Sequence, residues 1–379
     1  MTGRILVAPD KFKGSVTAAE AAAAIAAGLR AARGDLEVVE LPVADGGDGT
    51  VAAVVAAGFD PVRAVVEGPT GEPVDATYAV RDGTAVIELA EAAGLRRLPG
   101  GAFAALTASS YGAGQLVRAA LGAGSATIVL GIGGSACTDG GAGLVEALGA
   151  RLYDADGRPV RRGGAALCNL ASVELGELPE RLRYAKKIRV ASDVANPLLG
   201  PSGAATVFGP QKGASPADVA LLDQALGRWA ALTAAATGRD VAAAPGTGAA
   251  GGTGFAALAY LDAELVPGID LVLGLIGFDA AAAGADLVIT GEGSLDSQTL
   301  AGKAALGVAR AAGRRGVPVV AVAGQVLLGR DELRAAGFAG AYSLGELETD
   351  LQARMTRAGE LLERLGGRIA ADRLWPSPG

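Results

Sequence analysis

The chain has 379 residues, of which 50% are hydrophobic and 19% charged, a composition that supports two or three domains with buried cores. Its net charge of −7 disfavours a nucleic-acid partner, because such a surface needs clustered basic residues. It contains no histidine and only two cysteines, which excludes histidine-dependent catalysis, histidine-ligated zinc and a disulfide framework.

Short apolar runs alternate with alanine- and leucine-rich helical stretches along most of the chain. The predicted strands are 5–8, 38–43, 127–130, 188–191, 287–290, 318–322 and 341–343. Most lead through a loop with Gly, Asp, Ser or Pro into a helix, an alternation typical of parallel sheets covered by helices on both faces. Ligands bind such sheets where the strands end.

Residues 62–90 follow another pattern. Three runs with short Gly- and Asp-containing turns predict an antiparallel meander over 62–67, 74–81 and 84–89. Residues 153–159 look like a second hairpin, and the Ala/Gly-rich stretch 242–257 like a loop or hinge. We therefore predict an α/β protein with two α/β domains. A doubly wound parallel sheet of Rossmann or flavodoxin type occupies 1–65 plus 280–379, and an inserted domain with a mixed sheet occupies 66–279.

The hydrophobic pattern predicts a cytoplasmic protein with no membrane partner. The first apolar run, 5–8, is too short for the core of a signal peptide. No stretch of the sequence has 18 consecutive apolar residues.

A glycine-rich loop, 131–141, follows a predicted strand and precedes a helix. Its backbone N–H groups can converge on one anion, either a phosphate or a carboxylate. The same loop matches a relaxed dinucleotide fingerprint, although the expected acidic residue about 20 positions later falls in the predicted hairpin. A turn that needs glycine only for close packing is the third interpretation. Residues assigned here to phosphate or substrate binding are Gly131, Gly133, Gly134, Ser135 and Asp139. Cys137 has no histidine to activate it and is interpreted as a small buried filler.

Lysine is used sparingly, in six of the 33 basic positions, and four of the six lie in loops rich in Gly, Ser or Pro. A compact ammonium can follow a moving phosphoryl group, which is a physical reason to keep lysine in such loops. We predict catalytic roles for Lys13 and Lys303, and substrate contacts for Asp10 and Lys11. For Lys212, function and ordinary loop charge remain equal alternatives.

Carboxylates at predicted strand ends complete the candidate site. Asp193 directly follows an apolar strand and is predicted to accept the proton of a hydroxyl group, with Asn196 as a substrate contact. Without histidine, a metal would be a hard ion held by oxygen ligands, first of all Mg²⁺. The predicted metal ligands are Glu292, Asp296 and Asp45, with Gly291, Gly293 and Ser294 at the phosphates. Asp48 is most simply the cap of a helix.

The chain has neither a P-loop motif nor the protein-kinase signature set. However, six segments, in order and spanning nearly the whole chain, resemble the bacterial glycerate kinase family of the first class. They are 8–15, 42–50, 131–143, 191–200, 208–214 and 290–303. One departure is visible, because Cys137 and Thr138 stand where the family usually has Thr and Asn.

The resemblance implies two α/β domains around a cleft and ATP-dependent phosphorylation of D-glycerate, with 2-phosphoglycerate favoured over 3-phosphoglycerate. From the chemistry of the loops we predict that backbone N–H groups of a glycine-rich loop and a lysine of the first loop hold the glycerate carboxylate. Asp193 would deprotonate the attacking hydroxyl, and Lys13 and Lys303 would neutralise the transferring group. Two alternatives stay open: an NAD(P)-linked hydroxy-acid oxidoreductase, and a non-catalytic sugar-acid-binding regulator. The sequence does not indicate an oligomeric state.

Overall fold

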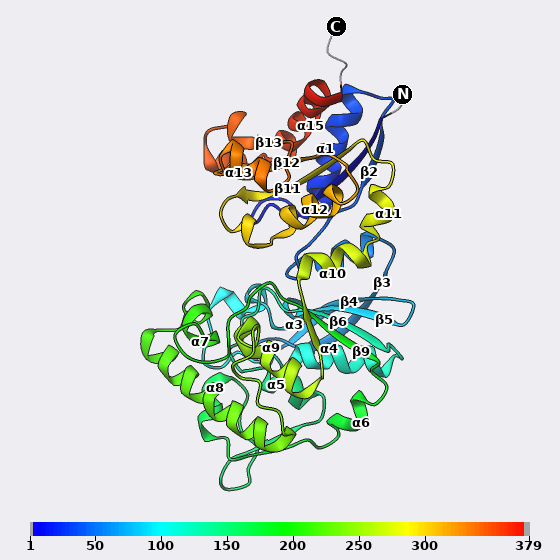
Figure 1. Cartoon of the computed structure of the whole chain (residues 1–379). Helices are drawn as coiled ribbons and strands as arrows, with labels where there is room; N and C mark the ends of the chain where they lie inside the picture. Colours follow the sequence, from blue (N-terminus) through cyan, green and yellow to red (C-terminus); the bar gives the residue numbers. More distant parts are fainter. Residues whose placement is uncertain (1–2, 375–379) are drawn as a thin grey trace. The chain divides into compact units, whose positions relative to one another are not determined.

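A computed structural model describes residues 3–374, which form two compact units (Figure 1). The first comprises the described residues up to Asp45, Ala52–Gly58 and those from Ile269 onward. The second comprises Gly46–Val51 and Phe59–Gly268. Our predicted boundaries lie at 65–66 and 279–280, and they do not anticipate the short segment 46–51. Helices α2 (Thr50–Ala56) and α10 (Gly268–Leu275) contain residues at which the chain passes between units.

The first unit is built on a five-stranded parallel sheet in the order β13-β12-β11-β1-β2. Its strands are β1 (Arg4–Pro9), β2 (Glu37–Glu40), β11 (Leu287–Leu295), β12 (Val319–Val326) and β13 (Gly340–Ser343). Its helices are α1 (Ala18–Ala32), α11 (Phe278–Ala282), α12 (Ala304–Gly313), α13 (Arg330–Ala335), α14 (Leu351–Thr356) and α15 (Ala358–Leu374). The predicted doubly wound parallel sheet is confirmed.

The connections of this sheet run in two directions from its middle. The crossover through α1 leads from β1 to β2, and the crossover through α12 leads from β11 away to β12. Because right-handed crossovers in opposite directions place their helices on opposite faces, α1 and α12 cover different faces. Helix α1 packs on α15, and a Cβ on Gly28 would collide with the Glu363 carbonyl oxygen. The sheet therefore has a topological switch point between β1 and β11.

The second unit contains a mixed six-stranded sheet in the order β10-β9-β6-β5-β4-β3. The predicted meander is confirmed as β3 (Asp60–Glu67), β4 (Pro73–Arg81) and β5 (Thr84–Glu88). Strands β5, β6 (Thr127–Gly131), β9 (Lys187–Ala191) and β10 (Glu264–Val266) are parallel. The helices are α3 (Leu89–Ala93), α4 (Tyr111–Gly122), α5 (Ala142–Ala147), α6 (Leu178–Leu182), α7 (Ala204–Phe208), α8 (Pro216–Thr237) and α9 (Ala249–Tyr260). Trp229 and Phe255 are fully buried in its core.

The short hairpin predicted at 153–159 is confirmed, because Tyr153 and Pro159 form an antiparallel bridge and the Asp154 N–H donates to the Arg158 carbonyl. The Asp154 carboxylate accepts two further backbone N–H groups within the turn. Strand β7 (Arg151–Tyr153) also pairs with the distant β8 (Ser172–Glu174), which the sequence did not predict. The stretch 242–257 needs correction, because it is not simply a loop and its second half begins the buried helix α9. Its residues 250–252 have positive φ, and a Cβ on Gly251 would collide with the Cys137 carbonyl oxygen.

No helix within residues 3–374 has both the length and the apolar character that crossing a bilayer requires.

Candidate active site

The switch point of the first unit brings two predicted site residues together. Strands β1 and β11 are neighbours, with Pro9 opposite Gly291, so Asp10 and Glu292 follow side by side at the carboxyl edge. The backbone N–H of Asp10 donates to the Gly291 carbonyl over 2.8 Å. In open α/β sheets this is the position where ligands bind.

Asp10 is almost completely buried at this edge, with 7% of its surface exposed. Burial raises the pKa of Asp10 to about 7, and the nearby negative charges of Asp45 and Glu292 act in the same direction. Lys11 opposes this effect, with its Nζ 3.6 Å from Asp10 Oδ1 and its backbone N–H donating to the same oxygen. The three carboxylates therefore form a negatively charged region that a bound cation would stabilise.

Glu292 is held by two neighbours. Its Oε1 accepts the Thr299 hydroxyl at 2.7 Å, and Lys303 Nζ lies 4.0 Å from Oε2. Burial nevertheless raises the pKa of Glu292. Asp296 lies near it in the following loop. Desolvation acts to raise the pKa of Asp296, but hydrogen bonds from the Gln298 N–H and the Ser294 hydroxyl keep it below its usual range.

The remaining predicted phosphate residues lie on the same edge of this unit. Lys13 is exposed in the loop after β1, and a Cβ on Gly293 would lie 3.5 Å from its backbone nitrogen. Gly291 allows close strand packing, since a Cβ there would collide with the Val322 carbonyl. Within residues 3–374, no three Asp, Glu or Cys side chains converge as a ready-made metal site. The donor set around Glu292 consists of hard oxygen atoms, so it fits Mg²⁺ if phosphate oxygens and water complete the coordination.

In the second unit, neighbouring parallel strands end in register. Glu88 at the end of β5 lies opposite Gly131 at the end of β6, which lies opposite Ala191 at the end of β9. Asp193 therefore follows at the same carboxyl edge as the glycine-rich loop and Glu88. This edge is the counterpart of the Asp10–Glu292 edge in the first unit.

The segment Gly46–Val51 lies across this edge and explains the glycines of the loop. A Cβ on Gly131 would collide with the Gly46 carbonyl oxygen. On Gly133 it would lie 2.6 Å from Gly47 Cα, and on Gly134, where φ is +74°, 2.6 Å from Asp48 Oδ1. These contacts favour close packing, one of the three interpretations drawn from the sequence, as the reason for glycine here. Phosphate binding by these residues stays a prediction.

Asp139 is held in this loop by hydrogen bonds from the surrounding protein. Asp139 is 1% exposed and accepts hydrogen bonds from Ser109, Ser110, Gly141 and Gly143. The structure therefore gives Asp139 a role in fixing the start of α5, and a substrate contact stays a prediction.

Lys212 is buried beneath the same loop, with 2% of its surface exposed. It donates to Ser135 Oγ over 2.9 Å and to the Cys137 carbonyl. Burial lowers the pKa of Lys212 and raises the pKa of Cys137 to about 12, which confirms Cys137 as an unreactive filler. Because the ammonium binds neutral oxygens within the protein, the solvated-loop interpretation of Lys212 is wrong.

Asp193 is exposed, and its Oδ1 accepts the Gly268 N–H over 2.8 Å. That hydrogen bond fixes the direction of the carboxylate and leaves the side chain accessible, as a general base requires. Asn196 is half-buried, and its Nδ2 donates to the Ser202 carbonyl over 2.8 Å. Both residues lie in the loop that follows β9.

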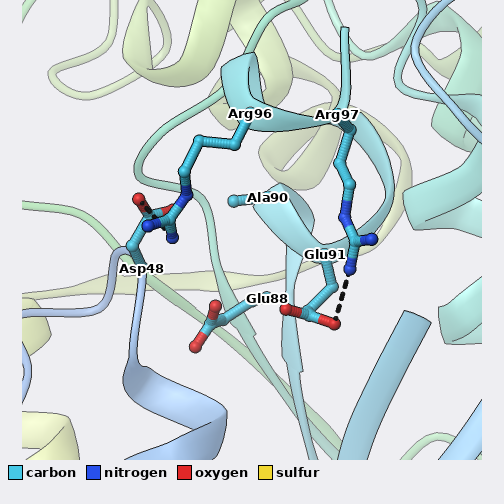
Figure 2. Close-up of a pocket in the computed structure, with 6 residues that line it drawn as sticks. All are labelled: Asp48, Glu88, Ala90, Glu91, Arg96 and Arg97. Atoms are coloured by element: carbon cyan, nitrogen blue, oxygen red, sulfur yellow. Dashed lines mark hydrogen bonds and ion pairs between the residues drawn. The ribbon is translucent and has the colours of Figure 1, made fainter. Parts of the chain in front are cut away.

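A pocket of about 280 Å³ opens in the second unit beside the end of β5 (Figure 2). It is lined by Asp48, Glu88, Ala90, Glu91, Arg96 and Arg97. Two ion pairs flank it, Arg96 with Asp48 at 2.8 Å and Arg97 with Glu91 at 3.2 Å. The expected capping by Asp48 is not what the structure shows, because Glu88 Oε1 accepts the Val51 N–H at the start of α2.

Glu88 is the main residue that the sequence analysis missed. Burial raises its pKa to about 7, and the charges of Glu91 and Asp48 add to the effect, while N–H groups of Val51 and Gly49 oppose it. The run Ala-Val-Ile-Glu, an apolar strand with a carboxylate at its end, carries the same signal that identified Asp193. The sequence pattern predicts this run only as the last strand of the meander.

The chain is similar to known proteins in both sequence and structure. The sequence model of the glycerate kinase family matches residues 5–374. A glycerate kinase of Halalkalibacterium halodurans is 43% identical over 98% of each chain, and the glycerate 2-kinase of Escherichia coli K12 is 45% identical over 85% of each. A crystal structure of a protein named as a glycerate kinase 2, from Salmonella typhimurium LT2, superposes with a TM-score of 0.83. It has 43% identity and covers 98% of both chains.

Proposed function

This chain belongs to the glycerate kinase family and is a kinase, and from that premise we propose that it transfers the γ-phosphoryl group of ATP to a hydroxyl of D-glycerate. We further propose 2-phosphoglycerate as the favoured product. The observation that carries the proposal is a family match over residues 5–374 that includes a relative named glycerate 2-kinase. Candidate residues at the carboxyl edges of both sheets supply the chemistry.

The first unit supplies the groups proposed to handle the nucleotide phosphates. Lys13 and Lys303 would neutralise charge on the transferring group, and Glu292, Asp296 and Asp45 would hold Mg²⁺. Backbone and hydroxyl donors of Gly291, Gly293 and Ser294 would contact phosphate oxygens. A bound Mg²⁺ would neutralise charge on the β- and γ-phosphates. The mutual repulsion of Asp10, Asp45 and Glu292 supports a cation at this edge.

The second unit supplies the group proposed to activate the acceptor. Asp193 takes the proton of the attacking hydroxyl as the new O–P bond forms, and the bond between the γ-phosphorus and the β-phosphate oxygen breaks to release ADP. The Gly268 N–H keeps the carboxylate oriented for this step. Ser135, Asp139, Asn196, Asp10 and Lys11 are the proposed substrate contacts. A cytoplasmic location and the absence of nucleic-acid and membrane partners are part of the same proposal.

The test is ADP release from MgATP by the whole protein, with and without D-glycerate, followed by NMR of the product. Glycerate-dependent ADP and a phosphoglycerate product support the proposal, and phosphorus–proton couplings distinguish the 2- from the 3-phosphate. No glycerate-dependent turnover by folded protein would refute it. The oxidoreductase and regulator alternatives gain no support from the family match.

A further inference from the structure

The pocket beside β5 contains residues to which the proposed mechanism gives no role. It lies in the second unit at the end of a parallel strand, in register with the strands that carry Gly131 and Ala191. Small-molecule sites of α/β proteins are found at such strand ends. Figure 2 shows two guanidinium groups on opposite sides of the pocket, with the Glu88 carboxylate lower down between them. This arrangement suggests a ligand that is small and polar.

The hydrogen-bonding capacity of the lining favours a ligand that brings acceptors. Among the described residues, the guanidinium of Arg96 pairs only with Asp48, and that of Arg97 only with Glu91. A guanidinium has five N–H donors, so most donors of both groups are left for water or ligand. In contrast, Glu88 and Glu91 already accept backbone N–H groups as well as their other contacts.

We propose that this pocket binds the carboxylate of the hydroxy-acid acceptor, in place of the glycine-rich loop and the first-loop lysine to which the sequence assigned it, with Arg96 as the principal binding residue and Arg97 as the second. The proposal rests on the proposed function, which makes a small hydroxy acid the substrate. A guanidinium matches a carboxylate with two parallel hydrogen bonds. The lone pairs that remain on the carboxylates of the lining can accept from the ligand's hydroxyl groups, and Ala90 offers a small apolar surface to its carbon atoms. A hydroxy acid combines these features, whereas a simple polyol lacks the carboxylate.

Arg96 is able to exchange partners without disturbing the fold. Its side chain is 77% exposed, and exposed ion pairs contribute little to stability because water and salt screen them. The chain contains a matched pair elsewhere in the same unit. Arg158 binds Asp156 at the same 2.8 Å, and its side chain is 74% exposed. Removing either arginine should therefore affect folding equally little.

The experiment compares Arg96→Gln with the control Arg158→Gln in the whole protein. Calorimetry measures D-glycerate binding without nucleotide, and steady-state kinetics give KM for D-glycerate and for ATP. We expect Arg96→Gln to weaken D-glycerate binding and to raise the KM for D-glycerate about tenfold or more. This is the change in affinity expected when one charge-assisted hydrogen bond is lost. The KM for ATP should stay within about twofold. The control should match the wild type.

A second comparison uses glyceramide, in which a neutral amide replaces the carboxylate. Wild-type protein should prefer D-glycerate to glyceramide, and Arg96→Gln should lose most of that preference, because the arginine acts on the carboxylate. An unchanged preference, or glycerate affinity equal in both arginine variants, overturns the pocket assignment while phosphorylation by the wild type still supports the proposed function. Wild-type protein that neither binds nor phosphorylates D-glycerate refutes the proposed function, and the assignment falls with it.

Discussion

Asp10 in the first unit and Glu88 in the second occupy comparable places, each at the carboxyl end of a buried strand. Burial raises the pKa of both to about 7, in a chain that has no histidine. Their neighbours differ. Glu88 accepts backbone N–H groups of the segment 46–51, whereas Asp10 lies among the charges of Lys11, Asp45 and Glu292. The buried carboxylate of Glu88 therefore fixes a backbone segment in the second unit, whereas that of Asp10 lies within a cluster of charged groups in the first unit.

The largest effect should come from Asp193, if the edge of the second unit activates the acceptor. Asp193→Asn keeps the shape of the side chain but removes the base, so kcat should fall by about 10²- to 10⁴-fold while ATP affinity stays the same. Steady-state kinetics and nucleotide titration measure both. Asp223→Asn is the control, because Asp223 also accepts a backbone N–H, from Gly200 at 3.0 Å. Equal turnover in both variants would remove Asp193 from the mechanism.

The second-largest effect should be on the pH dependence of stability. It tests the buried negative charge of Asp10 at the carboxyl edge of the sheet in the first unit. The pKa of Asp10 in the folded protein, about 7, exceeds its ordinary value of 3.8, so the folded state binds more protons between these values. Wild-type stability should fall as pH rises through this window, and Asp10→Asn should escape the loss. From pH 5 to pH 8 the variant should gain about 2–3 kcal/mol relative to wild type, at about 1.4 kcal/mol per pKa unit. Parallel stability curves from urea unfolding would contradict the assignment.

Glu88 tests whether the second edge depends on the backbone hydrogen bonds that its carboxylate accepts. Glu88→Ala leaves the N–H groups of Val51 and Gly49 without their acceptor, so the free energy of unfolding should fall by about 2 kcal/mol. Glu88→Gln retains an acceptor oxygen and should lose less. Denaturant unfolding at pH 7 compares the two. If alanine and glutamine were equally tolerated, Glu88 would not hold the segment 46–51.

The smallest effect concerns Lys303, whose Nζ lies 4.0 Å from Glu292 Oε2. If the first edge handles phosphates, Lys303→Ala should raise KM for ATP about tenfold, as expected for one charge-assisted contact. KM for D-glycerate should change less. Lys186→Ala, which removes an exposed lysine of the other unit, is the control. Identical ATP kinetics in the two variants would make Lys303 a surface lysine.

Most of the sheet strands could be predicted because an apolar run bounded by Gly, Asp or Pro is typical of a strand that is buried on both faces of its sheet. Strand β10 was missed because it has only three residues, Glu264–Val266, and its place depends on pairing with the distant β9. The pairing of β7 with β8 was missed for the same reason. No local pattern shows which of two short extended segments meets a partner far along the chain.

The candidate site shows the same limit. Asp10 and Glu292 could be selected singly because each follows an apolar strand, but their proximity depends on the register of β1 and β11. The burial of Lys212 was not visible, since Gly-Pro-Gln-Lys-Gly has the composition of an exposed turn. The glycines of 131–134 were visible, but not the segment Gly46–Asp48 that packs against them. Sequence indicates chemically useful residues, and only the fold supplies their partners.

The segment Gly46–Val51 also decides how the second unit could be cut out of the chain. Its flanking residues belong to the first unit, so a fragment spanning 59–268 would contain every strand of the mixed sheet yet lack this segment. The surfaces of Gly131, Gly133 and Ala191 that face Gly46 and Gly47 would then be uncovered, and Glu88 would lose Val51. A fragment that begins at Gly46 keeps these contacts. A fragment that retains the contacts of the second unit is therefore longer than the uninterrupted stretch 59–268.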